Sequence, residues 1–359
     1  MRVAILSVSK NGELLSKKLK SLLDNDFTVI KTDTFHKDVE NNIKRVFNDY
    51  DVIIGIMATG ILVRNICKNI SNKYSDPAVL SIDDKGNFVI SLLSGHMGGA
   101  NQFTKKIANL LSSKEVITTA TDIHGKIGVD VLANKFYWNI INKKEVLTFN
   151  KALLENEILH LKSNSDTMRY IEEFFMEVFF SDNKELEHGT LEDVRNYIKN
   201  KYNIVLKVDE KLNNKIIAKI RDTELEFKPK KLVVGIGSRK NVREEHVLIA
   251  IEKVMADLDV SVLRIDGLAT VSIKRKELGI IKAFKIINEP FSIIEKEKIE
   301  DFYLSDRSKD CRKSSFVKEK FGIDGVSEAC AMIAAGENSK LIHRKIAICG
   351  VTVAVAVSK

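Results

Sequence analysis

The chain has few cysteines, few prolines and no long apolar run, and these absences exclude several classes of protein. The 4 cysteines are far apart and form no C-x-x-C pair, which argues against a zinc site or a disulfide scaffold and fits reduced thiols. No apolar run approaches the roughly 20 residues that a membrane span requires. With 3 prolines, 44% hydrophobic and 30% charged residues, the composition is that of a soluble globular protein.

The start of the chain and its charge indicate location and partners. The opening MRVAILSVSKNGELL has an apolar run too short for a signal peptide, so we expect a cytoplasmic protein. The net charge of +8 favours an acidic partner, either nucleic acid or a polycarboxylate or phosphate ligand. Nucleic acid is the less favoured partner, because the basic residues are spread among acidic ones and no DNA- or RNA-binding motif is visible.

The pattern of apolar residues predicts an α/β protein with three parts. Residues 1–133 alternate short apolar runs with helical spacing, which is typical of a mostly parallel sheet covered by helices. Residues 134–228 show weak alternation, and we predict a small middle α+β segment there, with the Phe-rich run 174–180 as core. Residues 229–359 return to strand–turn–helix patterns. The prediction is two α/β domains flanking a middle segment.

Two short apolar runs, 27–31 and 260–265, are also predicted as strands. In the first domain, small or polar turns follow three predicted strands. These turns are ATG at 58–60, SGHMGG at 94–99 and TATD at 119–122. Because parallel strands end at the same edge of a sheet, we expect the three turns to converge on one crevice.

The stretch 88–101, FVISLLSGHMGGAN, carries the strongest functional signal. A strand, a glycine-rich turn and a helix place the turn where α/β proteins bind ligands, and the N–H groups that open the helix favour an anion. His96 adds a group that exchanges protons near neutral pH. The turn matches neither G-x-G-x-x-G nor a P-loop, and a turn of this kind often serves packing alone. The residues alone therefore indicate only a ligand edge that favours an anion.

Four further residues outside that turn are candidates. Arg64 follows the ATG turn and is placed to hold a carboxylate. Asp122 either orients His96 or serves as a helix cap, and the sequence does not separate the two. Arg239 lies in a second strand–turn–helix turn, GSRK at 237–240, which also favours an anion. Glu328 lies in an Ala-rich helix, where composition favours a solvated position.

Several ordered blocks of sequence resemble one known family, the CbiG proteins. The quoted blocks are ATGILVR (58–64), DPAV (76–79), the stretch 88–101, VITTATD (116–122), VDVLA (129–133), VVGIG (233–237), the spaced pattern 269–279, FS (291–292), GVSEA (325–329), Lys345 and TVAVA (352–356). The resemblance covers 1–133 and 229–359. Ser238 and Asn241 depart from the residues usual in the family, Cys and Gly.

The resemblance implies a cobalt-precorrin-5A hydrolase of anaerobic cobalamin biosynthesis. Such an enzyme opens the δ-lactone of its substrate with water and releases acetaldehyde, which contains the carbon that bridged rings A and D, to give cobalt-precorrin-5B. The cobalt belongs to the substrate, so neither a cofactor nor a protein metal site is expected. The implied partners are the cobalt-containing tetrapyrrole and neighbouring enzymes of the pathway, with neither nucleic acid nor a membrane.

On this resemblance we assign hypothetical roles. His96 is the general base, Asp122 orients it, and Glu328 assists expulsion of the two-carbon fragment. The N–H groups of Gly98 and Gly99 stabilise the oxyanion. The remaining predicted substrate-binding residues are Thr59, Gly60, Arg64, Ser94, Asn101, Thr121, Arg239 and Lys274. A non-catalytic tetrapyrrole carrier is the first alternative, and a hydrolase or transferase of an unrelated phosphate ester or polycarboxylate is the second.

Overall fold

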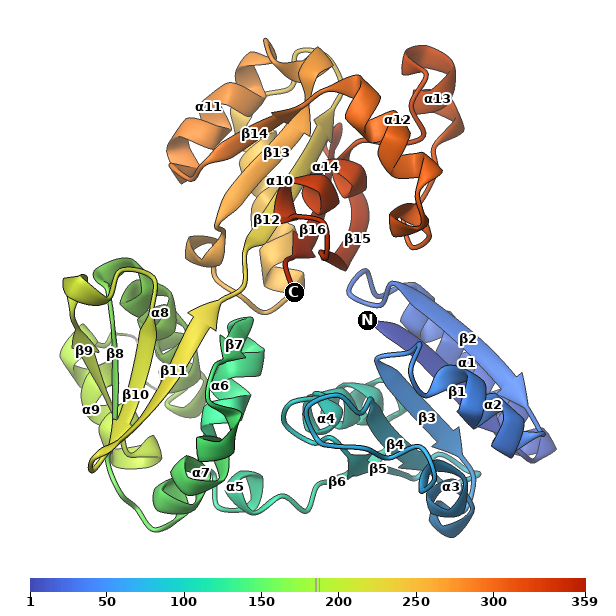
Figure 1. The fold of residues 1–359 in the computed structure, drawn as a ribbon, viewed down its shortest axis with the longest axis vertical. Helices are drawn as coiled ribbons and strands as arrows, with labels where there is room; N and C mark the ends of the chain where they lie inside the picture. The colour runs from blue at the N-terminus through green and yellow to red at the C-terminus, as the bar shows by residue number, and fades with distance from the viewer. Residues whose placement is uncertain (185, 187) are drawn as a thin grey trace. The chain divides into compact units, whose positions relative to one another are not determined.

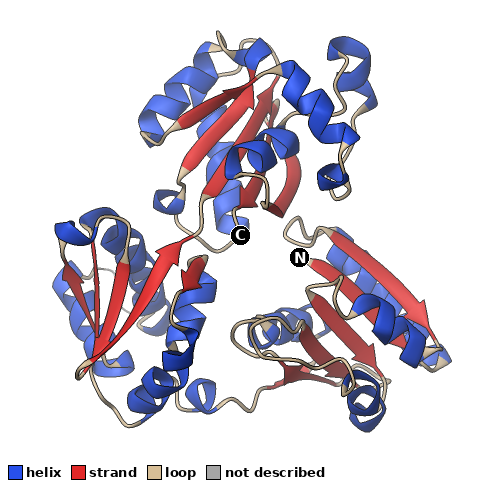
Figure 2. Ribbon diagram, in the orientation of Figure 1, coloured by secondary structure: helices blue, strands red, loops and turns tan. Residues whose placement is uncertain are grey.

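The computed structural model describes residues 1–184, 186 and 188–359, and its contacts divide the chain into two compact units. The first unit contains Met1–Lys135 and Asn142–Glu157, and the second contains Phe136–Ile141 and Ile158–Lys359. Both units combine helices with sheets (Figures 1 and 2), so the α/β class is confirmed. The described residues form three sheets, and each of the three predicted segments supplies the bulk of one sheet.

The sheet of the first unit has the order β2-β1-β3-β4-β5-β6. Its strands are β1 (Arg2–Ser7), β2 (Lys31–His36), β3 (Val52–Ile56), β4 (Ala78–Ile82), β5 (Phe88–Leu93) and β6 (Lys114–Val116). The first four strands are parallel, whereas β5 runs antiparallel to β4, and β6 is parallel to β5. The sheet is therefore mostly parallel, as predicted, with one reversal.

Helices cover both faces of this sheet because its central strands are apolar on both sides. On one face, α1 (Lys10–Asp24) and α4 (Ala100–Leu111) pack Leu19 and Phe103 against a layer that includes Ile5. On the other face, α2 (Val39–Val46) and α3 (Thr59–Ile66) pack Ile43 and Leu62 around Ala4. Three short helices complete the unit: α5 (Ala120–Ile123), α6 (Val129–Lys135) and α7 (Val146–Leu154).

The reversal at β5 separates the three turns that we expected to converge. The turn after β3 is at the end of β4, where Thr59 Oγ1 is 3.1 Å from Ser81 Oγ. The turn after β5 is at the start of β4, because a Cβ placed on Gly98 would come within 3.3 Å of the Ala78 nitrogen. The expectation of one shared crevice is therefore wrong for residues 58–60. The short turn 83–87 joins β4 to β5, and a turn of this length joins only antiparallel strands.

The second unit contains a five-stranded sheet with the order β7-β11-β10-β8-β9. Its strands are β7 (Trp138–Ile140), β8 (Leu159–Ser163), β9 (Ile204–Val208), β10 (Ile216–Ile220) and β11 (Thr223–Pro229), and its helices are α8 (Ser165–Asp182) and α9 (Leu191–Tyr202). The Phe-rich run lies in α8, where Phe175 and Phe179 are buried, so its prediction as core is confirmed for these two rings.

The other sheet of the second unit has the order β14-β13-β12-β16-β15. Its strands are β12 (Leu232–Ser238), β13 (Gly267–Val271), β14 (Phe291–Ile294), β15 (Lys340–Ile348) and β16 (Val351–Val357), and its helices are α10 (Glu244–Asp257), α11 (Leu278–Ile287), α12 (Lys296–Leu304), α13 (Ser315–Phe321) and α14 (Ser327–Ala335). Close packing of α14 requires Gly235, since a Cβ there would lie 2.0 Å from the Ser327 carbonyl oxygen.

Two predicted strands are wrong, each for a local reason. At 27–31, the Asp26 carboxylate accepts hydrogen bonds from the backbone and hydroxyl of Thr28, which fixes a turn and delays the strand to Lys31. At 260–265, the Ser261 hydroxyl accepts from the Leu263 N–H at 3.0 Å and begins a 3₁₀ helix over Val262–Arg264.

Candidate active site

The turn after β5 is shaped by one strained residue and one glycine. Ser94 adopts φ +58°, a left-handed conformation that is uncommon for a residue with a side chain. A Cβ on Gly98 would lie 2.5 Å from the Ser94 Cβ, so only glycine fits there. The Gly99 N–H donates to the His96 carbonyl at 3.0 Å. The predicted oxyanion role of the Gly99 N–H is therefore wrong, because that group already has an acceptor.

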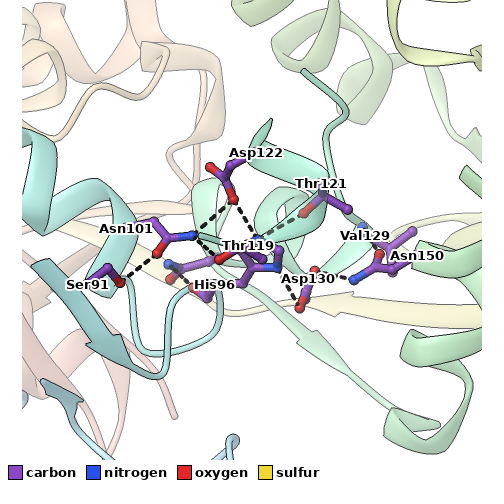
Figure 3. Close-up of polar contacts among 10 residues, drawn as sticks. Ser91, His96, Asn101, Thr119, Thr121, Asp122, Val129, Asp130 and Asn150 are labelled. Carbon is purple, nitrogen blue, oxygen red and sulfur yellow. Dashed lines mark hydrogen bonds and ion pairs between the residues drawn. The ribbon is translucent and has the colours of Figure 1, made fainter. Parts of the chain in front are cut away.

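This turn presents His96 between two carboxylates, as Figure 3 shows. The His96 Nε2 atom is 2.9 Å from Asp122 Oδ2, and the Nδ1 atom is 3.2 Å from Asp130 Oδ2. The Thr121 hydroxyl is also 3.2 Å from Nε2. The predicted contact between Asp122 and His96 is present, and Asp130 is an additional partner.

The two carboxylates determine the charge of the imidazole. Burial alone would lower the pKa of His96, but the hydrogen bonds and charges of Asp122 and Asp130 outweigh it and raise the pKa to about 9. Burial would likewise raise the pKa of each carboxyl, and the contact with His96 instead holds both below their usual range. At neutral pH the group is an imidazolium between two carboxylates, and both ring nitrogens are engaged.

Asn101 organises one side of this group. Its amide nitrogen donates to Asp122 Oδ2 and to the Thr119 hydroxyl, each at 3.0 Å, and its amide oxygen accepts from the Ser91 hydroxyl at 2.7 Å (Figure 3). Asn101 is buried and begins α4 with Ala100. Its side chain is therefore committed to positioning Asp122 rather than displayed toward a ligand.

A cavity of about 540 Å³ opens at His96, and its lining includes Ser94, Thr121 and Asp130. This volume is within the range of roughly 300–1,000 Å³ that is common for small-molecule sites. The Ser94 Oγ atom is buried and has no hydrogen-bond partner among the described residues. A buried hydroxyl that lacks a partner, in a residue that lines a cavity, is suited to donate to a ligand oxygen.

Thr59, Gly60 and Arg64 are not part of this cavity. They follow β3 and lie at the opposite edge of the sheet, where the Arg64 guanidinium donates to the Gly60 carbonyl at 3.2 Å. The structure therefore does not bring these three residues to His96, contrary to the expectation of convergence.

The candidates of the second unit are used in local contacts. Both oxygens of Glu328 accept backbone hydrogen bonds, from Arg312 at 2.6 Å and from Lys345 at 2.9 Å. Its side chain is buried, so the predicted solvated position is wrong. Lys274 is also buried, and its ammonium donates to the Arg239 carbonyl at 3.0 Å and pairs with Glu277 at 3.3 Å. Arg239 follows β12, and its N–H donates to the Gly350 carbonyl.

Sequence reasoning assigned no role to Asp130 or to the residue that holds it. Asn150 in α7 donates from Nδ2 to Asp130 Oδ1 at 2.9 Å, and its oxygen accepts from the Val129 N–H at 2.9 Å (Figure 3). One feature of the sequence could have identified Asp130, because it is an acidic residue among apolar ones. Its neighbours Val129 and Leu132 are core residues of α6. No sequence spacing pointed to Asn150.

Comparisons with known proteins identify the family of the chain. The family model described as "Cobalamin synthesis G N-terminal" matches residues 41–122, which include His96 and Asp122. The model described as "Cobalamin synthesis G C-terminus" matches residues 232–356. Together the two matches cover more than half of the chain. The chain belongs to the CbiG family.

Relatives resemble this CbiG chain over nearly its full length. A Methanocaldococcus jannaschii protein named "Probable cobalt-precorrin-5A hydrolase" is 29% identical over 99% of both chains. A Priestia megaterium protein named "Cobalt-precorrin-5A hydrolase" is 26% identical over 98% of this chain and 94% of its own. A cobalamin biosynthesis protein G homologue from Sulfolobus solfataricus, known from a crystal structure, is 27% identical in sequence. Its fold matches 99% of this chain and 97% of its own with a TM-score of 0.53.

None of the described helices combines the length and the apolar character needed to cross a bilayer. Among the described residues, no group of three or more His, Cys, Asp and Glu side chains is arranged to hold a metal ion.

Proposed function

We propose that this chain is a cobalt-precorrin-5A hydrolase, which opens the δ-lactone of cobalt-precorrin-5A with water and releases acetaldehyde to give cobalt-precorrin-5B. Membership of the CbiG family and relatives with this name over nearly the whole chain support the activity. The observation that carries the site assignment is the His96 imidazole, which lies between two carboxylates at a cavity in the first unit.

The charge of His96 changes the role that we first assigned to it. A general base needs a free lone pair, and an imidazole with a pKa of about 9 carries a proton on both nitrogens at neutral pH. We therefore assign His96 as the proton donor. Asp130 lines the cavity beside it and is assigned as the group that accepts a proton from the attacking water. Asp122 keeps its predicted orienting role.

The reaction then proceeds in two stages. Water adds to the lactone carbonyl and gives a proton to Asp130, while the unpartnered Ser94 hydroxyl donates to the carbonyl oxygen. The bond from the carbonyl carbon to the ring oxygen breaks, and His96 protonates the departing oxygen, which leaves a carboxylic acid and a hydroxyl. The new carboxylic acid releases its proton to solvent. The hydroxyl then gives its proton to the now neutral His96, the bond between the two-carbon fragment and the macrocycle breaks, and acetaldehyde departs while the electron pair stays on the macrocycle.

The substrate brings its own cobalt in this proposal, so the protein residues supply binding and proton transfer only. The first unit contributes cations around the cavity, which suits a ring with many carboxylates. A cytoplasmic location and contacts with neighbouring pathway enzymes stay predictions.

The test is anaerobic incubation with cobalt-precorrin-5A, in which a coupled alcohol dehydrogenase measures acetaldehyde. Many equivalents of acetaldehyde per protein are expected, whereas a carrier would bind substrate and release none. In the same assay His96→Ala should lose about 100-fold or more in kcat, the usual effect of removing a general acid or base. Retention of a tenth of wild-type turnover by this variant would remove His96 from the mechanism.

A further inference from the structure

Helix α7 has one face that is buried in the core and another that lines the cavity. Its Val146, Phe149, Ala152 and Leu153 side chains are buried. The cavity is lined by the residues at positions i, i+3, i+4 and i+7 of the other face, which are Leu147, Asn150, Lys151 and Leu154. Leu147 is 71% exposed. A cavity wall with two leucines on one helical face is suited to an apolar surface of a ligand.

The rotation of α7 is fixed by the active-site group itself. The Asn150 amide bonds both to the Asp130 carboxylate and to the Val129 N–H, each at 2.9 Å. Just before the helix, the Tyr74 hydroxyl donates to the Lys143 carbonyl at 2.7 Å. These bonds hold the exposed Leu147 and the half-buried Leu154 toward the cavity, so both leucines belong to a positioned surface.

Two lysines give the same wall a positive charge. Lys151 is in α7, and its nearest carboxylate, Glu155, is 3.9 Å away with both side chains exposed. Lys73 lines the cavity from the segment between α3 and β4, and its ammonium lies 5.2 Å from the centroid of the Tyr74 ring. An exposed ion pair such as Lys151–Glu155 is weak, and the Lys73 side chain is exposed, so both ammonium groups are available to a ligand carboxylate.

We propose that α7 is the substrate-binding wall of this site, with Leu147 and Leu154 against the face of a tetrapyrrole ring, and Lys151 and Lys73 on its peripheral carboxylates. This inference rests on the proposed function and extends it, because it names the residues that bind the substrate. Helix α7 lies outside both family matches and in the predicted middle segment 134–228, to which the sequence assigned no role.

The test separates binding from turnover. Binding of uroporphyrin III, a stable octacarboxylate tetrapyrrole, is followed by fluorescence for the wild type, Leu147→Asp and the double variant Lys73→Met/Lys151→Met. Each change should raise Kd about tenfold, and the double variant should also lose much of the salt dependence of binding. In the acetaldehyde assay the same variants should raise KM with little change in kcat.

Matched controls are Leu14→Asp, at a leucine of α1 that is 66% exposed, and Lys144→Met, in the segment just before α7. Neither residue lines the cavity, and neither change should alter Kd or KM. Thermal unfolding reports whether each variant is folded, and Leu147→Ser replaces Leu147→Asp if the latter is not.

The outcomes distinguish the two proposals. Folded wall variants that match the wild type in Kd and KM overturn the wall, even if acetaldehyde release establishes the hydrolase. Loss of uroporphyrin binding in the wall variants, with no acetaldehyde from the wild type, supports the wall and refutes the hydrolase. A wild type that binds no uroporphyrin at millimolar concentration also overturns the wall.

Discussion

Asp130 in the first unit and Glu328 in the second are both buried carboxylates, but the groups that surround them differ. Asp130 contacts an imidazolium and an amide beside a cavity, and its pKa lies below the usual range. Glu328 accepts two backbone N–H groups, and burial, only partly offset by these bonds, raises its pKa. Burial alone therefore does not identify a carboxylate as catalytic. Asp130 differs from Glu328 because it lies beside the protonated imidazole of His96 and beside a cavity.

The largest effect that this comparison predicts is at Asp130. Asp130→Asn should lower kcat about 100-fold, because the variant loses both the proton acceptor and one of the charges that keep His96 protonated. The measurement is the acetaldehyde assay across a range of pH. Wild-type activity should decline as pH rises through about 9, where His96 loses its proton, and the variant should decline at a lower pH.

NMR titration of His96 is the control for this interpretation. The pKa of His96 should fall in Asp130→Asn, and an unchanged pKa would contradict the assignment even if activity were lost. Stability gives an independent check. Because the folded pKa of His96 lies above the unfolded value of about 6.5, its contribution should be complete below about pH 6.5 and lost as pH rises through about 9.

Glu328→Gln should have the opposite signature. One backbone N–H would then face an amide NH₂ instead of a carboxylate oxygen, which costs about 1–3 kcal/mol in the free energy of unfolding. Denaturant unfolding measures this loss, and kcat per folded molecule should stay within about threefold of wild type. A fall of 100-fold in kcat with unchanged stability would restore the catalytic role that we first assigned to Glu328.

The smallest effect should be at Arg64. The Arg64 guanidinium donates to the Gly60 carbonyl of its own helix and lies at the edge of the sheet opposite His96. Arg64→Met should therefore change kcat and KM less than about twofold, as is usual for surface substitutions. Steady-state kinetics with cobalt-precorrin-5A are the measurement. A large rise in KM would show that the substrate reaches both edges of the sheet.

The sequence was sufficient where local pattern decides the structure. The alternation of apolar runs in 1–133 predicted a mostly parallel sheet, and the glycine-rich turn in 88–101 led to His96 and to its contact with Asp122. The direction of β5 was also encoded, because the turn 83–87 is too short for a parallel crossover. We expected the turns at 58–60, 94–99 and 119–122 to lie at the same edge of the sheet, and this expectation misplaced Thr59, Gly60 and Arg64.

What the sequence did not reveal depends on segments that meet only in the folded chain. Asp130 and Asn150 are separated along the chain, and their bond forms because α6 and α7 pack together. The charge of His96 likewise follows from two carboxylates supplied by different helices. Neither helix spacing nor strand alternation carries this information, since both describe a single element at a time.

The path of the chain between the two units affects how the protein is made. Strand β7 interrupts the first unit, and it pairs with β11 of the second. During synthesis, Trp138 and Ile140 of β7 therefore leave the ribosome well before Thr223–Pro229 of β11 are made. The apolar side chains of β7 stay unpaired until β11 has been synthesised. A gene fragment that ends at residue 133 would moreover omit α7 and with it one wall of the cavity.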